Sequence, residues 1–232
     1  MMKKFACLLL AMLLLVCLCS CVPNTGNLRG EIETPSSSTN TPDNNETPPP
    51  STGPELSLGK TENNRYHNDY FGISCTLPSN WIFYTDEEIR ELNNFTMDTF
   101  DEDFAEALKN ATVIYDMFAK HPNDLGSTNV NMEKLSALQV LMLDLKANIE
   151  LQLPSLETSY TNMGYTNIQT AYTKITVNGK EYDGMTLTCQ LQGINFYSAS
   201  ICYIKNSYLV SINVGSLITN ETDTLWSYYT LS

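Results

Sequence analysis

Apolar residues recur at helical spacing through the middle of the chain. From residue 134 to 153 they form one stripe, made of Leu135, Leu138, Met142, Leu145, Ile149 and Leu153. A stripe of this period predicts an amphipathic helix over residues 134–153 that packs on a sheet. Proline lacks the backbone N–H that a helix interior uses, so Pro154 is expected to kink this helix or to end it.

Three further helices are indicated by end signals and by spacing. Thr85 and Glu88 have the spacing of a capping box, which predicts a helix that begins there and buries Ile89. Apolar residues at helical spacing predict a second helix over residues 100–110. A last helix is expected from Thr219, because acids follow it at the positive end of the helix dipole.

Alternating apolar and polar residues predict a series of short strands. The segments are 64–70, 72–77, 81–84, 113–119, 128–132, 168–177, 180–191, 196–205 and 208–215. Asn178 and Gly179 separate two of them and are a strong signal for a type I′ hairpin. Short connections favour a mainly antiparallel sheet, with helices on both of its faces. The predicted fold class is α+β.

Three cysteines lie in the strand-rich part of the chain. Cys75 and Cys189 alternate with apolar residues, so both are predicted to be small core residues on strands. An odd number of thiols without a Cys-x-x-Cys pair is not a disulfide framework. A bridge between Cys189 and Cys202 stays open at this point, because it depends on the strand register.

Residues 66–81, which read YHNDYFGISCTLPSNW, contain Asn68, Gly72, Pro78 and Trp81. With the order of elements above, this segment resembles the opening of the PsbP-like fold. That superfamily includes an extrinsic photosystem subunit, a Ran-binding nuclear import factor and many bacterial lipoproteins. The resemblance implies an α/β/α sandwich in which Gly72 and Pro78 shape turns and Trp81 fills core. It carries over no catalytic residue, because a shared fold does not deliver a function.

The amino terminus has the three parts of an export signal. Lys3 and Lys4 precede an apolar run over residues 5–18, and Ser20 comes directly before Cys21. Leu18 to Cys21 resembles the lipobox of bacterial lipoproteins, which implies that residues 1–20 are a signal peptide and that Cys21 carries the lipid. A plain secretory signal or an anchor helix is the alternative, but a membrane span needs roughly 20 apolar residues.

The segment after Cys21 has the composition of a spacer. Residues 22–60 contain seven of the ten prolines and are rich in Ser and Thr. Such a segment has little to bury, so residues 21–60 are predicted to be a lipidated cysteine and a disordered tether. A glycosylated stalk is the alternative. Residues 61–232 are then a single α+β domain, held by lipid on the extracytoplasmic face of the cell membrane.

The charge balance excludes one class of partner and marks one surface. The chain has 13 Lys and Arg against 26 Asp and Glu, a net charge of −13, so a nucleic-acid partner is not expected. Acids concentrate over residues 86–106. Asp98, Asp101, Glu102 and Asp103 could bind a basic protein partner or calcium, although a solvated helix face is the better explanation for them.

No familiar catalytic motif or cofactor motif is present. The only histidines are His67, next to a predicted hairpin turn, and His121, in a predicted loop, and a metal site or a catalytic pair would need the fold to bring them together. An enzyme with an unfamiliar site would have to draw on Asp116 with His121 or on the acidic segment. The sequence therefore predicts no enzyme, no cofactor and no metal site.

Aromatic residues gather near the start of the predicted domain, at Tyr66, Tyr70, Phe71, Trp81, Phe83 and Tyr84. Alternation along strands sends some of them into the core and leaves others exposed, where an aromatic face could stack on sugar rings. The predicted function is a lipid-anchored module that binds an unknown protein or envelope component. A cell-envelope enzyme or a carbohydrate-binding protein is the alternative.

Overall fold

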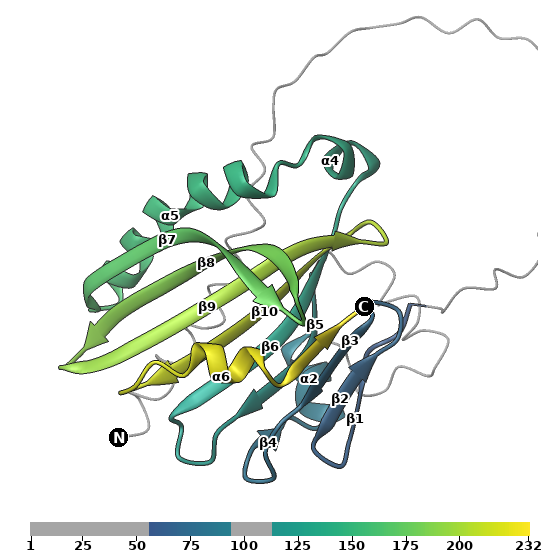
Figure 1. Cartoon of the computed structure of the whole chain (residues 1–232), viewed down its shortest axis with the longest axis horizontal. Coiled ribbons are helices and arrows are strands. Elements are labelled where there is room, and N and C mark those ends of the chain that lie inside the picture. Colours follow the sequence, from purple (N-terminus) through teal and green to yellow (C-terminus); the bar gives the residue numbers. More distant parts are fainter. Residues whose placement is uncertain (1–55, 94–112) are drawn as a thin grey trace, which may run out of the picture.

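The computed structural model of the chain describes residues 56–93 and 113–232, which form two antiparallel sheets and four helices (Figure 1). The smaller sheet has the order β1-β2-β3-β11, with β1 Lys60–Glu62, β2 Arg65–Asn68, β3 Ile73–Thr76 and β11 Tyr229–Leu231. The larger has the order β4-β5-β6-β10-β9-β8-β7. Its strands are β4 Ile82–Phe83, β5 Val113–Lys120, β6 Gly126–Lys134, β7 Thr166–Val177, β8 Lys180–Leu191, β9 Ile194–Lys205 and β10 Tyr208–Leu217.

The helices are α2 Asp86–Leu92, α4 Ala137–Met142, α5 Leu145–Asn162 and α6 Thr222–Trp226. Figure 1 shows α5 lying along β7 and β8, whereas α6 and β11 cross the sheet on its other side. Alternation along the strands supplies both cores: in β9, Phe196 packs with α5, and Ile201 packs with α6 and the small sheet. The predicted α+β class is confirmed.

The single helix predicted over residues 134–153 is wrong. β6 continues to Lys134, and Ser136 then caps α4 by accepting a hydrogen bond from the Gln139 amide. Asp144 caps α5 in the same way, so two polar caps interrupt a continuous apolar stripe. Leu138 and Met142, placed on that stripe by periodicity, are 65% and 72% exposed. Pro154 lies inside α5, which continues to Asn162.

Several local predictions are confirmed. Thr85 and Glu88 form the capping box at the start of α2, and Ile89 is buried. Asn178 and Gly179 have φ values of 51° and 78°, as a type I′ hairpin between β7 and β8 requires. The last helix begins later than expected, at Thr222 and not at Thr219. The helix predicted over residues 100–110 lies outside the described residues.

The fold begins upstream of the boundary predicted at residue 61. Leu56 and Leu58 pack against the core, and the Gly59 amide donates a 2.6 Å hydrogen bond to Asp116 Oδ1. Lys60 is already in β1. These two leucines are enough to attach the end of the predicted tether to the domain, because each buries apolar surface against the core. Residues 56–60 therefore belong to the folded part of the chain.

The three cysteines of the described residues are buried, and none of them is in a disulfide. Cys189 lies opposite Phe196 in β9, whereas Cys202 lies opposite Asp183 in β8. The two thiols are thus several strand positions apart along one sheet, and the bridge left open between Cys189 and Cys202 does not form. Cys75 and Cys189 occupy the core positions predicted for them.

Candidate functional site

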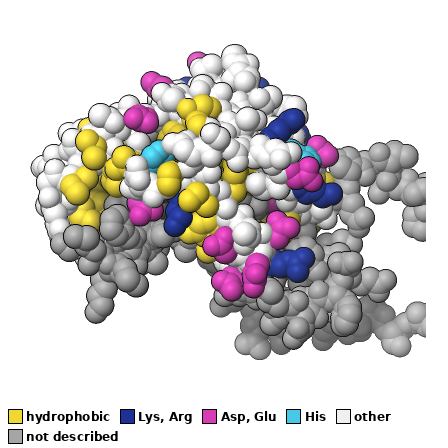
Figure 2. All heavy atoms as spheres, turned by 90° about the horizontal axis from the view of Figure 1, so that it is seen from below, with side chains coloured by type: hydrophobic (Ala, Val, Ile, Leu, Met, Phe, Trp, Pro, Cys, Tyr) yellow, Lys and Arg dark blue, Asp and Glu magenta, His cyan; other side chains and the backbone are white. Residues whose placement is uncertain are grey.

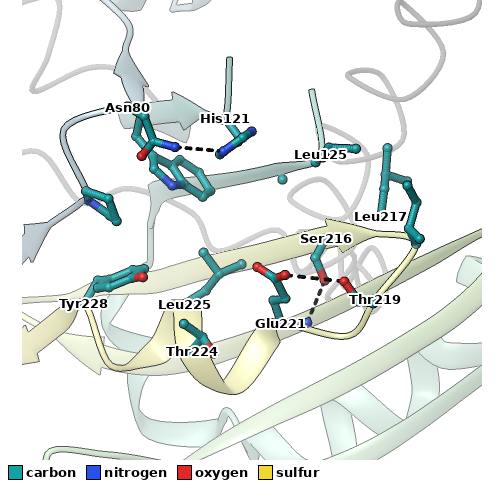
Figure 3. Close-up of a pocket in the computed structure, with 14 residues that line it drawn as sticks. Asn80, His121, Leu125, Ser216, Leu217, Thr219, Glu221, Thr224, Leu225 and Tyr228 are labelled. Carbon is teal, nitrogen blue, oxygen red and sulfur yellow. Dashed lines mark hydrogen bonds between the residues drawn. The ribbon is translucent and has the colours of Figure 1, made fainter. Parts of the chain in front are cut away.

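A cavity of about 540 Å³ opens at the end of the sheets where β5 turns into β6 (Figure 3). Three segments that are distant in sequence line it: the turn around Trp81, the hairpin over residues 121–126, and the connection over residues 216–228. Strand pairing brings them together, because β5, β6 and β10 are neighbours in the large sheet. In the figure, the side chains of Asn80 and His121 lie on one wall and those of Ser216 and Glu221 on the other.

Trp81 lines this cavity next to a tight turn and a glycine. Its amide donates a 3.0 Å hydrogen bond to the Pro78 carbonyl. A Cβ atom at Gly126 would lie 3.3 Å from the indole ring and 3.1 Å from the Gly215 carbonyl oxygen, so the absence of a side chain at residue 126 lets the hairpin pass close to the ring. Trp81 is half-buried and also touches the core, so it fills core as expected and lines the cavity as well.

His121 closes the β5–β6 hairpin and faces Trp81. Its amide donates to the Gly126 carbonyl at 2.8 Å, and its ring lies edge-on to the indole with centroids 5.8 Å apart. The Asn80 side-chain nitrogen lies 3.0 Å from Nε2, and the Asn123 amide lies 3.4 Å from Nδ1. These contacts orient the imidazole through neutral amide groups.

The opposite wall is a strained loop between β10 and α6. The Glu221 amide donates a 3.0 Å hydrogen bond to Ser216 Oγ, and the Thr219 hydroxyl lies 3.4 Å from Glu221 Oε1. Ile218 has a φ of 71°, and the Thr219 amide bonds the Leu217 carbonyl across it at 2.8 Å. A β-branched residue in this left-handed turn is an outlier, and such strain concentrates at functional loops.

Exposed apolar side chains lie beside the cavity. Leu125, Ile194 and Ile218 are 40%, 51% and 59% exposed. Backbone hydrogen bonds hold their segments together, from the Leu217 amide to the Leu125 carbonyl and from the Ile218 amide to the Asn195 carbonyl. Figure 2 views the molecule from below Figure 1 and shows hydrophobic side chains on the surface with acidic side chains near them. The cavity thus has an apolar border next to its polar walls.

Asp116 and His121, one of the two options suggested for an enzyme, do not meet in one site. Asp116 is buried, accepting hydrogen bonds from the Gly59 amide, the Tyr66 hydroxyl and Asn68 Nδ2, and it lines a different cavity from His121. Burial raises the pKa of its carboxyl above the ordinary value, although these hydrogen bonds act in the opposite direction. Asp116 is a structural acceptor for the segment that leads into β1.

The other predicted site residues are either dispersed or not described. His67 lies in β2 opposite Lys60 and Ser74, and no group of three or more His, Cys, Asp or Glu within the described ranges could hold a metal ion. Cys21 and the acidic set Asp98, Asp101, Glu102 and Asp103 lie outside the described residues. In the part of the chain that the structure describes, no helix is both long and apolar enough to cross a membrane.

The predicted aromatic row divides between the core and the cavity. Tyr66 and Phe71 are buried, and Trp81 reaches the cavity. Sequence reasoning missed Ser216, Glu221 and Tyr228, which complete the site from the other end of the chain. The local pattern around Glu221 indicates only a helix start, and nothing in it pairs this acid with Trp81.

Comparisons with known proteins give no family for this chain. No protein-family model matches it, and no curated protein matches it. Among solved structures, it is similar to LpqN, which is described as involved in cell envelope biogenesis of Mycobacterium tuberculosis. The match has a TM-score of 0.37 and 10% identity, and it covers 69% of this chain and 83% of LpqN. A likeness at this level carries no argument about function, so a functional assignment has to rest on the chain's own residues.

Proposed function

We propose that this chain is a lipid-anchored extracytoplasmic binding module whose ligand site is the cavity beside Trp81. The anchor is supported by the lipobox-like Leu18 to Cys21 and by the proline-rich segment after it. The PsbP-like resemblance of residues 66–81 is compatible with this role, because members of that superfamily bind partners and share no common chemistry.

The observation that carries the binding site is the set of groups around Trp81. A partly exposed indole is flanked by Asn80 with His121 and faced by Ser216 with Glu221. An aromatic face surrounded by amide, imidazole, hydroxyl and carboxylate groups fits a ligand that is apolar on one face and rich in hydroxyls at its edge. Sugars have this character, so carbohydrate is the ligand class that the cavity favours.

Tryptophan fluorescence tests the site directly, because the chain has two tryptophans and only Trp81 lines the cavity. In Trp226→Phe, Trp81 is the sole tryptophan, and titration with oligosaccharides released from bacterial cell walls should give a saturable change in tryptophan fluorescence. Trp81→Phe retains Trp226, which is 5% exposed, and should give no response. A Trp226→Phe chain that does not respond to any cell-wall or glucan oligosaccharide would contradict the carbohydrate assignment.

A pair of acids in one segment provides a matched control. Glu221 lines the cavity, whereas Asp223, two residues later, is exposed and does not line it. Glu221→Gln should weaken binding about three- to tenfold, because a charged acceptor is replaced by a neutral one. Asp223→Asn should leave the affinity unchanged, and equal losses in the two variants would place the ligand elsewhere.

The anchor has its own test, which is independent of the cavity. Labelling of cells with radioactive palmitate should mark the chain, and Cys21→Ala should abolish the label. Cys19→Ala, which removes a neighbouring thiol that comes after bulky Leu18, should retain it. A label that survives Cys21→Ala would show that the lipobox assignment is wrong.

The enzyme alternative makes a different prediction about the same ligands. Binding without chemistry leaves the oligosaccharide unchanged after prolonged incubation with the full chain, as followed by mass spectrometry. If the oligosaccharide is converted, and a single substitution in the domain abolishes the conversion, the chain is an enzyme and the binding-module proposal is wrong. The neutral partners of His121 and the separate location of Asp116 favour binding.

A further inference from the structure

Four lysines gather around a groove at the opposite end of β8 from the β8–β9 turn. The groove has a volume of about 900 Å³, and Lys146, Lys174, Lys180 and Lys205 are among the residues that line it. Three acids, Asp144, Glu181 and Asp183, line the same groove, so cations slightly outnumber acids here, whereas the whole chain has half as many cations as acids, 13 against 26. This groove is separate from the cavity beside Trp81 and shares no lining residue with it.

The groove exists because the large sheet opens between two of its strands. Pairing between β8 and β9 stops at Asp183 opposite Cys202. On either side the hairpins continue, since β7 pairs with β8 as far as Lys180, and β9 pairs with β10 as far as Lys205. The ends of the two hairpins therefore part, and Figure 1 shows the β7–β8 hairpin curving away from the β9–β10 hairpin.

On the side of the groove nearest α5, two cations lie close to one acid and its tyrosine partner. Lys174 Nζ lies 2.7 Å from Asp183 Oδ1, and the Tyr172 hydroxyl donates to the same oxygen at 2.6 Å. Lys146 Nζ lies 5.3 Å from the centre of the Tyr172 ring, and its contact with Glu150 is a long 3.8 Å pair between exposed side chains. Exposed pairs of this kind contribute little, so positive charge remains available here.

On the other side of the groove, two more lysines stand at its border. Lys180 Nζ lies 5.2 Å from the centre of the Tyr182 ring, and that ring lies 5.4 Å from the ring of Tyr203. Lys205 donates a 2.9 Å hydrogen bond to the main-chain oxygen of Ser232. The walls are thus aromatic, and the ammonium groups stand at their edges.

Two of the three acids that line the groove are already engaged, one by a helix end and one by a lysine of the groove itself. Asp144 caps α5 through the Ala147 amide at 3.0 Å, and Asp183 is held by Tyr172 and Lys174. Partial burial acts to raise the pKa of Asp183, but the hydrogen bonds from Lys174 and Tyr172 hold this pKa below its usual range. Glu181 remains as the exposed acid of the hairpin.

We propose that this groove binds the phosphate group of a polyol phosphate ester. Lysine ammonium groups bind phosphate oxygens as compact point charges, and several of them around one opening suit an anion whose oxygens face in several directions. The volume of the groove greatly exceeds that of a single phosphate ion, and its tyrosine walls can pack against the organic part of the ligand. The same chemistry occurs in glycerol phosphate polymers and in phosphatidylglycerol headgroups.

Calorimetry with the full chain in neutral detergent tests this assignment and distinguishes the two sources. One titrant is a short glycerol phosphate oligomer, and the other is mixed micelles that contain phosphatidylglycerol, with phosphatidylcholine micelles as the reference. Binding of the oligomer identifies a soluble polymer, whereas binding of phosphatidylglycerol micelles alone identifies a lipid headgroup. Either interaction should weaken as salt is raised, because screening acts on exposed charges.

The variant Lys146→Gln with Lys180→Gln removes two exposed charges and leaves the hydrogen bonds of Lys174 and Lys205 intact. It should weaken binding about tenfold. Lys60→Gln with Lys120→Gln changes the net charge equally, outside the groove, and should weaken binding less than about twofold. Equal losses in the two double variants, or no saturable binding of either titrant by the parent chain, would overturn the proposal. The sugar titrations at Trp81 do not depend on this result.

Discussion

The Tyr66 hydroxyl donates a hydrogen bond to the carboxylate of Asp116 inside the core, joining β2 of the small sheet to β5 of the large one. The same carboxylate accepts from Asn68 at 2.8 Å and from the Gly59 amide at 2.6 Å. A buried acid with three donors is costly to place in the core and costly to remove once it is there. This single residue therefore connects both sheets with the segment that enters the fold.

Asp116→Ala should be among the most destabilising single changes in the domain. It removes the acceptor shared by the Tyr66 hydroxyl, Asn68 Nδ2 and the Gly59 amide, for which we expect a loss of about 3–5 kcal/mol in the free energy of unfolding. Urea denaturation followed by circular dichroism measures it. Asp69→Ala, at an exposed residue between β2 and β3, is the control and should cost less than about 1 kcal/mol. Similar costs for the two changes would show that the network contributes little.

The stability contributed by Asp116 should depend on pH with a definite sign. Burial raises the pKa of its carboxyl above the ordinary 3.8, so the folded state binds the proton more tightly than the unfolded state. This contribution is complete below pH 3.8 and is lost as the pH rises through the folded-state pKa. The difference in unfolding free energy between the parent and Asp116→Asn, which does not titrate, should fall over that interval. A difference that rises with pH would contradict the sign.

Two buried tyrosines should respond in opposite ways to loss of the hydroxyl. Tyr66 donates to Asp116, whereas the Tyr203 hydroxyl is buried without a hydrogen-bond partner in the part of the chain described. Tyr66→Phe should cost about 1.5–3 kcal/mol, because the partner is a charged group. Tyr203→Phe removes an unsatisfied hydroxyl and should be neutral or stabilising by about 1 kcal/mol. Thermal unfolding of the two variants side by side tests the contrast.

Strain at Ile218 can be relieved without loss of core. Its φ of 71° disfavours a β-branched residue, and its side chain is 59% exposed. Ile218→Gly should stabilise the domain by about 1 kcal/mol, since glycine adopts this conformation readily. Ile218→Val keeps the branching and should give no gain. A lower melting temperature for the glycine variant would show that the loop depends on the isoleucine side chain.

Alanine substitutions at two glycines of the β7–β8 hairpin should lower stability for different reasons, a steric clash at Gly184 and an unfavourable backbone conformation at Gly179. A Cβ atom at Gly184 would lie 2.3 Å from the Ser200 carbonyl oxygen, whereas one at Gly179, where φ is 78°, would meet nothing within 4 Å. Gly184→Ala forces strands β8 and β9 apart and should cost about 2–3 kcal/mol. Gly179→Ala should cost about 1 kcal/mol from its positive φ alone. Unfolding in urea measures both, and equal costs would argue against the close approach.

Local patterns predicted the elements whose signals are complete within a few residues. The Thr85 box, the Asn178–Gly179 hairpin and the alternation around Cys189 are of this kind. The break between α4 and α5 was missed because apolar periodicity continues through Asp144, whose capping role shows only once a helix end is located. Helical spacing alone does not show where a helix stops.

The candidate sites depend on contacts that local patterns do not contain. Trp81, His121 and Glu221 come from widely separated parts of the chain, and only the pairing of β6 with β5 and β10 brings them to one cavity. The lysine groove depends on where the β8–β9 ladder ends. Neither register nor ladder length can be derived from alternation, since a strand pattern of period two fits many partners.

The place where the chain enters the fold also determines how the domain would respond to force. A pull applied from the N-terminal side reaches residue 56 first, next to β1, a three-residue edge strand that could be peeled from β2 one pair at a time. Before that strand is loaded, the pull is borne together by the Gly59 contact with Asp116 and by the 3.2 Å contact from Asn68 to the Ser57 carbonyl. Mechanical resistance at this end is therefore governed by a cluster of side chains that acts as a clamp, and the size of either sheet matters little to it.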